Sequence, residues 1–141
     1  MKKIIILCLL SLLANGVKSQ ITCREFDHQP VTDTREELKA KKYDAEYEYS
    51  NTFANEELNE FVIRLAADST YYIVGVGGKS VKEYNVTILD PSKNVIRTEK
   101  AKDKKNIFEY SPPKDGEYTI QIVVLCKSNN CAYIGVFGKP K

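Results

Sequence analysis

The stretch that decides the fold is residues 83–99, EYNVTILDPSKNVIRTE. Apolar side chains at positions 84, 86 and 88 alternate with Asn85 and Thr87. Because successive side chains of a β-strand point to opposite faces, this alternation predicts a half-buried strand. The next five residues, DPSKN, have a turn composition, in which Pro91 presets φ and Asp90 can accept bonds from backbone amides. VIRTE then returns, so the stretch predicts an antiparallel hairpin.

Apolar stretches of similar length lie on both sides of this hairpin. They are LNEFVIRLA and TYYIVGVGG before it, and NIFEY, EYTIQIVVLC and CAYIGVFG after it. Turn-forming segments separate them at a spacing of about 8–12 residues, and no helical period intervenes. The sequence therefore predicts an all-β fold for residues 43–141, an antiparallel β-sandwich or jelly roll of about seven to eight strands.

Residues 20–42 predict an N-terminal arm with a short helix. The segment DTREELKAKKY has the capping-box pattern, in which Thr34 is followed three residues later by Glu37. Beyond this pattern, only Leu38, Ala40 and Tyr43 could form an apolar face. We therefore expect a helix that is loosely docked on the sandwich.

The first 19 residues, MKKIIILCLLSLLANGVKS, have the three parts of a secretory signal peptide. Two lysines precede an apolar run, and small residues precede a cleavage point between Ser19 and Gln20. The apolar run of about ten residues is shorter than the roughly 20 that span a bilayer. We therefore expect an exported protein, secreted or periplasmic.

The mature chain is close to neutral. Residues 20–141 carry 18 basic and 19 acidic side chains, because three of the lysines belong to the signal peptide. This balance gives no general attraction to nucleic acid or to an anionic membrane surface. We expect neither as a partner.

Three cysteines remain in the mature chain, Cys23, Cys126 and Cys131. Their spacing lacks the pattern of a metal site or of a redox motif at a helix start, so we expect a structural disulfide. If Cys126 faces Cys131 across a hairpin, Val124 faces Tyr133 in the same register. A bridge from Cys23 would instead close a loop of more than a hundred residues, which is worth about 4–5 kcal/mol in the loop-entropy model. Three pairings stay open, Cys126–Cys131, Cys23–Cys126 and Cys23–Cys131, because connectivity cannot be deduced from spacing.

A tyrosine stripe is the best candidate for a binding surface. In YDAEYEYS, Tyr43, Tyr47 and Tyr49 alternate with acidic residues, which predicts an edge strand with one aromatic and one acidic face. Tyrosine rings can stack on sugars or pack against a partner protein. The alternative is that the rings cover the core.

Other chemistry-bearing patterns are sparse. His28 is the sole histidine and has no recognisable nucleophile motif beside it, and the turn aspartates form no calcium-binding cluster. Asn85 begins the N-glycosylation pattern Asn-Val-Thr. The sequence therefore predicts no enzyme, no cofactor and no metal.

The strand pattern as a whole resembles a known group of proteins. FVIRLAADSTYYIVGVGG, EYNVTILDPSKNVI, FEYSPPKDGEYTIQIVV and CAYIGVFGKPK are similar to small exported β-sandwich proteins of Bacteroidetes-type bacteria. More distantly, their order is similar to the prepeptidase C-terminal (PPC-type) jelly-roll domain. The resemblance covers roughly residues 43–139, and its motifs are turns, glycines and core positions.

The resemblance implies a β-sandwich and a non-catalytic accessory role, with no assigned activity to carry over. It also implies that an early cysteine pairs with the one before the last strand, which favours Cys23–Cys131 and leaves Cys126 as an extra thiol. With the residue patterns, it leads us to expect an exported binding module for protein or glycan. A structural, envelope-associated protein is the alternative, and a carboxylate-based hydrolase is the least supported.

Overall fold

The computed structural model describes residues 26–102, 104–127 and 130–141. The expected signal peptide and Cys23 lie outside these ranges. Within them the chain forms one helix followed by eight strands: α1 (Gln29–Ala40), β1 (Asp44–Phe53), β2 (Leu58–Leu65), β3 (Ser69–Gly77), β4 (Val81–Leu89), β5 (Val95–Ala101), β6 (Lys105–Tyr110), β7 (Gly116–Cys126) and β8 (Asn130–Pro140).

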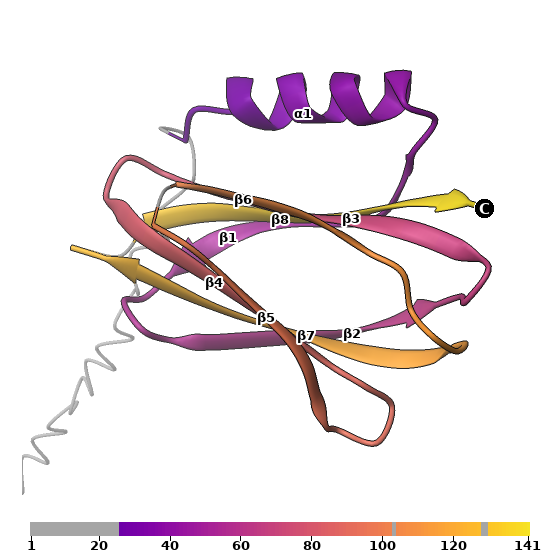
Figure 1. The fold of residues 1–141 in the computed structure, drawn as a ribbon. Coiled ribbons are helices and arrows are strands. Elements are labelled where there is room, and N and C mark those ends of the chain that lie inside the picture. Colours follow the sequence, from indigo (N-terminus) through magenta and orange to yellow (C-terminus); the bar gives the residue numbers. More distant parts are fainter. Residues whose placement is uncertain (1–25, 103, 128–129) are drawn as a thin grey trace, which may run out of the picture.

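The strands form two four-stranded antiparallel sheets that face each other, with the order β1-β8-β3-β6 in sheet A and β2-β7-β4-β5 in sheet B. Figure 1 shows the two layers, with α1 lying across the outer face of sheet A. The predicted β-sandwich is therefore confirmed. Edge strand β1 of sheet A lies beside edge strand β2 of sheet B, and at the other side of the sandwich β6 lies beside β5.

The hairpin that opened the sequence analysis is confirmed. β4 pairs with β5, and Thr87 lies opposite Thr98 on the outer face of sheet B. In the connecting turn, Asp90 Oδ1 accepts hydrogen bonds from the backbone amides of Ser92 and Asn94, at 2.8 and 2.9 Å. These bonds stabilise the carboxylate and lower the pKa of Asp90, with the Asn94 amide as the largest cause.

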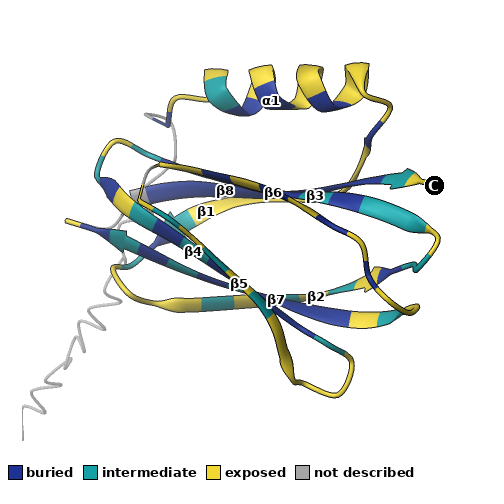
Figure 2. Ribbon diagram, in the orientation of Figure 1, coloured by how far each residue is buried: buried dark blue, intermediate teal, exposed yellow. Residues whose placement is uncertain are grey.

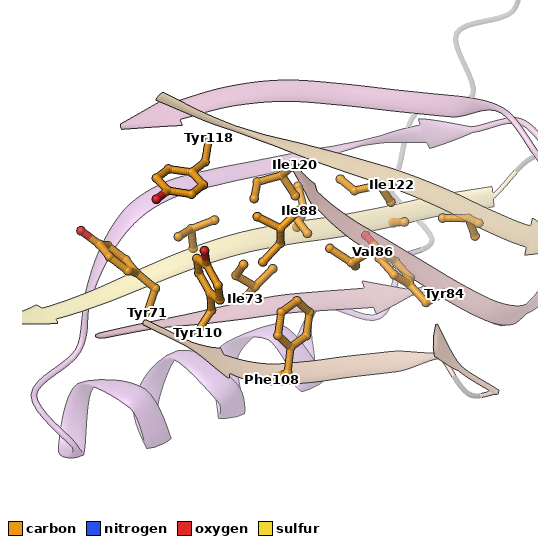
Figure 3. Packing of buried hydrophobic residues seen from close by; sticks show 14 of the residues in the cluster. Tyr71, Ile73, Tyr84, Val86, Ile88, Phe108, Tyr110, Tyr118, Ile120 and Ile122 are labelled. Carbon is orange, nitrogen blue, oxygen red and sulfur yellow. The ribbon is translucent and has the colours of Figure 1, made fainter. Parts of the chain in front are cut away.

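Tyr84 spans the space between the two sheets. Its side chain is fully buried, and its hydroxyl donates to the Tyr133 carbonyl oxygen of β8 at 3.0 Å. Gly75 on β3 makes room for the ring, because a Cβ at that position would lie 2.7 Å from Tyr84 Cδ1. Figure 3 shows the ring among the aliphatic side chains of the core. Burial strongly raises the pKa of Tyr84, so the phenol stays neutral.

The helix differs from its prediction in start and in docking. It begins at Gln29 with Pro30 in its first turn, and Thr34 lies inside it, donating to the Pro30 carbonyl at 2.7 Å. The predicted capping box at Thr34 is therefore wrong. The helix begins five residues earlier, where Pro30 is well suited to the first turn. Its inward face is Val31, Thr34 and Leu38, all at most 3% exposed. Figure 2 shows this buried stripe against an exposed outer face.

The expected hairpin of the last two strands is wrong. β7 pairs with β2 and β4, whereas β8 pairs with β1 and β3, so the chain crosses from one sheet to the other between them. Val124 lies opposite Tyr84 rather than Tyr133. The physical reason is that β8 is apolar on both faces, and it needs the core on one side and α1 on the other.

The cysteines of these strands lie on opposite sides of sheet A. Cys126 belongs to the cluster between the sheets, and Cys131 to the cluster beneath α1, which also contains Phe26. The register that would have set Cys126 against Cys131 is therefore absent. Cys23 precedes Phe26 by three residues, which span at most about 10 Å. Cys23 itself lies outside the described residues, so its pairing with Cys131 stays a prediction.

We predict that replacing Tyr84 with Phe lowers the free energy of unfolding by about 1–2 kcal/mol, because it removes a buried hydrogen bond between the sheets. Urea denaturation followed by circular dichroism measures the change. Tyr49→Phe is the matched control, since Tyr49 is 40% exposed. Equal stability of both variants would show that the Tyr84 hydroxyl does not hold the sheets together.

We predict a Cys23–Cys131 disulfide in the exported protein. Non-reducing peptide mapping by mass spectrometry should recover these two cysteines in one linked peptide. Reduction should then lower the free energy of unfolding by roughly 4 kcal/mol, because the bridge closes a loop of about a hundred residues. A linked Cys126–Cys131 peptide from the folded protein would contradict the pairing.

Candidate functional site

A pocket of about 270 Å³ opens at the edge that β1 and β2 share. Its walls come from both sheets, and its lining is mostly aromatic, with the Asn59 amide at the β2 side. The lining residues are Tyr47, Tyr49 and Phe53 from β1, Asn59, Glu60 and Phe61 from β2, and Ile122 from β7.

A stacked ring pair bridges the two edge strands at this pocket. The rings of Tyr47 and Phe61 lie 4.1 Å apart between centroids and are tilted by 12°. Both side chains are partly buried and pack against the main core. Burial, with a smaller contribution from neighbouring Tyr49, raises the pKa of Tyr47. The pair gives the pocket an apolar wall that the core holds in place.

A β-bulge divides the predicted tyrosine stripe. Ala45 lies opposite Phe137 and Tyr47 opposite Val136, so Glu46 is an extra residue in β1. One extra residue reverses the alternation of side chains along a strand. Tyr47 and Tyr49 therefore lie at the pocket, whereas Tyr43 precedes the bulge and lies beneath α1.

Tyr43 is 9% exposed and belongs to the second core. Its ring meets the Tyr72 ring edge-on, with centroids 4.8 Å apart, and its hydroxyl donates to Glu109 Oε2 at 3.4 Å. Desolvation and the Glu109 charge raise its pKa. The expectation that Tyr43 shares a face with Tyr47 and Tyr49 is thus wrong.

The opposite edge of the sandwich, between β5 and β6, is closed by polar bridges. Asn106 of β6 donates from Nδ2 to the backbone carbonyl of Tyr84 at 3.1 Å and to that of Glu99 at 3.3 Å. Arg97 of β5 donates to the Glu109 carbonyl at 2.7 Å, and its guanidinium carbon lies 4.8 Å from the centroid of the Phe108 ring. These bonds tie the two sheets together at one edge, while the other edge holds the pocket.

The pocket edge is acidic. β1, β2 and the turn between them, residues 44–65, contain six acidic side chains and one basic side chain, Arg64. Glu48 forms an ion pair with Arg35 of α1, and this contact raises the pKa of the Arg35 guanidinium. Glu48 also accepts a hydrogen bond from the Tyr133 hydroxyl at 2.6 Å. The other five acids take part in none of the ion pairs found in the described parts of the chain.

Besides Phe53 and Ile122, three more lining residues were not singled out from the sequence, namely Asn59, Glu60 and Phe61. They lie in LNEFVIRL, which reads as an ordinary strand, and its register with β7 places Glu60 opposite Gln121. Gln121 Nε2 donates to Glu60 Oε2 at 3.2 Å. The alternation of β2 predicts which side chains share a face, but no local pattern indicates that β2 lies beside β1 in the other sheet.

The remaining sequence candidates lie apart from the pocket. His28 is the N-cap residue of α1, and its ring meets the Phe26 ring edge-on at 4.9 Å. Asp115 accepts a hydrogen bond from the Ala67 amide at 2.7 Å, so it serves a turn. Asn85 lies half-buried in β4.

The described ranges hold neither a cluster of metal-binding side chains nor a membrane-spanning helix. Among residues 26–102, 104–127 and 130–141, no group of three or more His, Cys, Asp or Glu side chains is placed to hold a metal ion. The one helix within those ranges is too short and too polar to cross a membrane.

Comparison with known proteins identifies the fold but no family. No protein-family model matches the chain, and no curated protein sequence matches it. Among solved structures, PliG of Aeromonas hydrophila, a periplasmic inhibitor of g-type lysozyme, is similar with a TM-score of 0.50 and 16% identity, covering 70% of this chain and 90% of that chain.

Two carbohydrate-binding modules are also similar in structure. TmCBM61, solved in complex with β-1,4-galactotriose, has a TM-score of 0.45 and 15% identity over 68% of this chain and 72% of its own. A CBM4 module has a TM-score of 0.45 and 15% identity over 71% of this chain and 79% of its own. At this level of identity, the similarity to PliG shows that the chain has a β-sandwich fold.

Proposed function

We propose that this chain is an exported, non-catalytic binding protein that holds a protein or glycan partner at the β1/β2 pocket. The proposal of export rests on the signal-peptide pattern of residues 1–19. The sequence resemblance supports placing the chain with the small exported β-sandwich proteins of Bacteroidetes-type bacteria. The similarity to a periplasmic inhibitor concerns the fold, so the proposed binding role rests on the pocket.

The observation that carries the proposal is an aromatic pocket at the edge where β1 meets β2. Concave sites lined by rings and a few polar groups are the usual form of a binding site. Here Tyr47 and Phe61 are held by the core, while Tyr49 is 40% exposed, and Asn59 adds a polar group beside them. The arrangement offers ring surface for stacking and oriented groups for hydrogen bonds.

A purely structural role accounts for Tyr43 but not for Tyr49. Tyr43 is buried beneath α1, as a core-covering ring should be. Tyr49 leaves 40% of its surface in water, and its hydroxyl accepts a hydrogen bond from the neighbouring Asn51 side chain. A ring that is exposed and has an oriented hydroxyl is better suited to contact a partner than to cover the core.

We predict that Tyr49→Ala weakens ligand binding at least fivefold, because a contact ring of this size contributes about 1 kcal/mol or more. Ligands are first found by titrating the ¹⁵N-labelled protein with oligosaccharides and with acidic, neutral and basic peptides. At least one probe should give saturable amide shifts that centre on residues 47–61.

The matched control is Ile107→Ala, which removes a side chain of similar exposure, 38%, from β6 at the opposite edge. This variant should bind as tightly as the unmodified protein, and the dispersion of both spectra should confirm that the variants fold. Saturable shifts that centre on another surface, or equal losses in the two variants, would contradict a binding site between β1 and β2.

A further inference from the structure

We propose that edge strand β2 pairs with β2 of a second copy of this chain, so that sheet B continues from one copy into the other. The pairing is antiparallel and centred on Val62, which sets Glu60 of each copy opposite Arg64 of the other. This inference goes beyond the proposed ligand site. Three features of β2 carry it, namely its regular free edge, its self-complementary charges and its apolar side chains.

β2 is a regular strand at the end of sheet B. Among the described strands it pairs only with β7, in eight consecutive residue pairs without a register shift. On its other side, the backbone N–H and C=O groups of alternate residues point away from the sheet, where another strand can bind them. β2 also lacks lysine and proline, two residues that commonly protect an edge strand from pairing.

The other three edge strands are less suited to pairing. β1 has an extra residue at Glu46 and β5 has one at Ile96. A bulge leaves a residue unpaired and bends the strand, which hinders the addition of a further strand. β6 is only six residues long and begins with Lys105, and one of its carbonyls, that of Glu109, already accepts a hydrogen bond from the Arg97 side chain. An added strand is therefore best accommodated at β2.

The charges of β2 are complementary to those of a second β2. When a twofold axis passes beside Val62, the residue two positions before it lies opposite the residue two positions after it in the other copy. These residues are Glu60 and Arg64, and symmetry forms their contact twice. Both side chains are exposed and lie on the outer face of sheet B, with Val62 between them. Opposite charges that face each other across two strands stabilise the pairing.

Glu60 and Arg64 cannot satisfy each other within one copy. They are four residues apart on a strand, a separation of about 13 Å. Neither takes part in an ion pair found within residues 26–102, 104–127 and 130–141, although Glu117 of β7 lies opposite Arg64. Glu60 accepts one hydrogen bond, from Gln121 Nε2 at 3.2 Å, and a carboxylate can accept about four. The guanidinium of a second copy can supply further donors in a planar fork that matches the carboxylate.

The same register pairs apolar side chains on both faces of the sheet. On the outer face, Val62 is 56% exposed, and in the dimer it lies opposite Val62 of the second copy. Their contact removes apolar surface from water. On the inner face, Phe61 lies opposite Ile63 of the second copy, and aromatic and β-branched side chains form favourable cross-strand pairs. Phe61 and Ile63 are both partly buried and pack against the main core, so the pairing extends that core across the axis.

The test is sedimentation equilibrium of the mature protein, residues 20–141, over a series of concentrations. We expect a reversible equilibrium between monomer and dimer. Glu60→Arg and Arg64→Glu should each raise the dimer dissociation constant roughly fivefold or more, because each change sets two pairs of like charges opposite each other. The two substitutions combined exchange the charges, and they should restore the dissociation constant to within about twofold of that of the unmodified protein.

Lys100→Glu is the matched control for Arg64→Glu, because it reverses an equal charge on β5, the edge strand at the opposite end of sheet B. This variant should dimerise as tightly as the unmodified protein, and circular dichroism should confirm that every variant folds. Amide hydrogen exchange of the unmodified protein locates the contact without any substitution. At concentrations that favour the dimer, alternate amides of residues 59–65 should exchange more slowly than in the monomer.

A protein that stays monomeric at every concentration, or a dimer without slowed exchange in β2, would overturn the pairing. So would a folded double variant that fails to dimerise, or a loss in Lys100→Glu as large as that in Arg64→Glu. None of these outcomes affects the proposed ligand site, which is tested by titration and by Tyr49→Ala. Because Ile63 of the second copy would lie beside the pocket, that titration is run at concentrations where the unmodified protein is monomeric.

Discussion

The hydrogen bond from the Tyr84 hydroxyl to the Tyr133 carbonyl fixes how the two sheets face each other. Apolar contacts between sheets are non-directional, and they tolerate sliding as long as area stays buried. A buried hydroxyl is different, because leaving it without a partner costs about 1–3 kcal/mol. Gly75 is part of the same constraint, since any side chain there would overlap the Tyr84 ring. Together they set one alignment of β4 against β3 and β8.

With the sheets in that alignment, the two edges of the sandwich are closed by different contacts. At the β5/β6 edge, the Asn106 side chain reaches the backbone carbonyls of Tyr84 and Glu99, so the two sheets are linked by hydrogen bonds. At the β1/β2 edge, the link is the stacked pair of Tyr47 and Phe61, which leaves a pocket beside it. A ring pair holds two strands together without filling the space around its rim. The pocket is thus a consequence of how that edge is closed.

The two sheets also differ in what covers their outer faces. Sheet A has an apolar outer face, made by residues such as Val74, Val76 and Phe137, and α1 covers it. The ion pair of Arg35 with Glu48 and the Tyr133 hydroxyl then fasten the helix to edge strand β1. One acid of β1 thereby fastens the helix to the sheet.

The sequence by itself determined the fold class and most strand positions, because alternation and turn composition are local properties. Tyr84, Val86 and Ile88 lie in the core and Asp90 holds the turn, as their spacing predicted. The helix was predicted only roughly, since its docking face depends on sheet A beneath it.

Only the tertiary structure decided which strands are neighbours and what the tyrosines do. β7 and β8 are adjacent in sequence but lie in opposite sheets, which no local pattern encodes. In the sequence Tyr43 and Tyr47 belong to one alternating pattern. Because Glu46 is an extra residue in β1, Tyr43 lies beneath α1 whereas Tyr47 lies at the pocket. Phe61, from the other sheet, lies beside Tyr47 at the pocket. Strand pairing depends on burying both faces of the central strands. Which strands and helix cover those faces depends on residues far apart in the sequence.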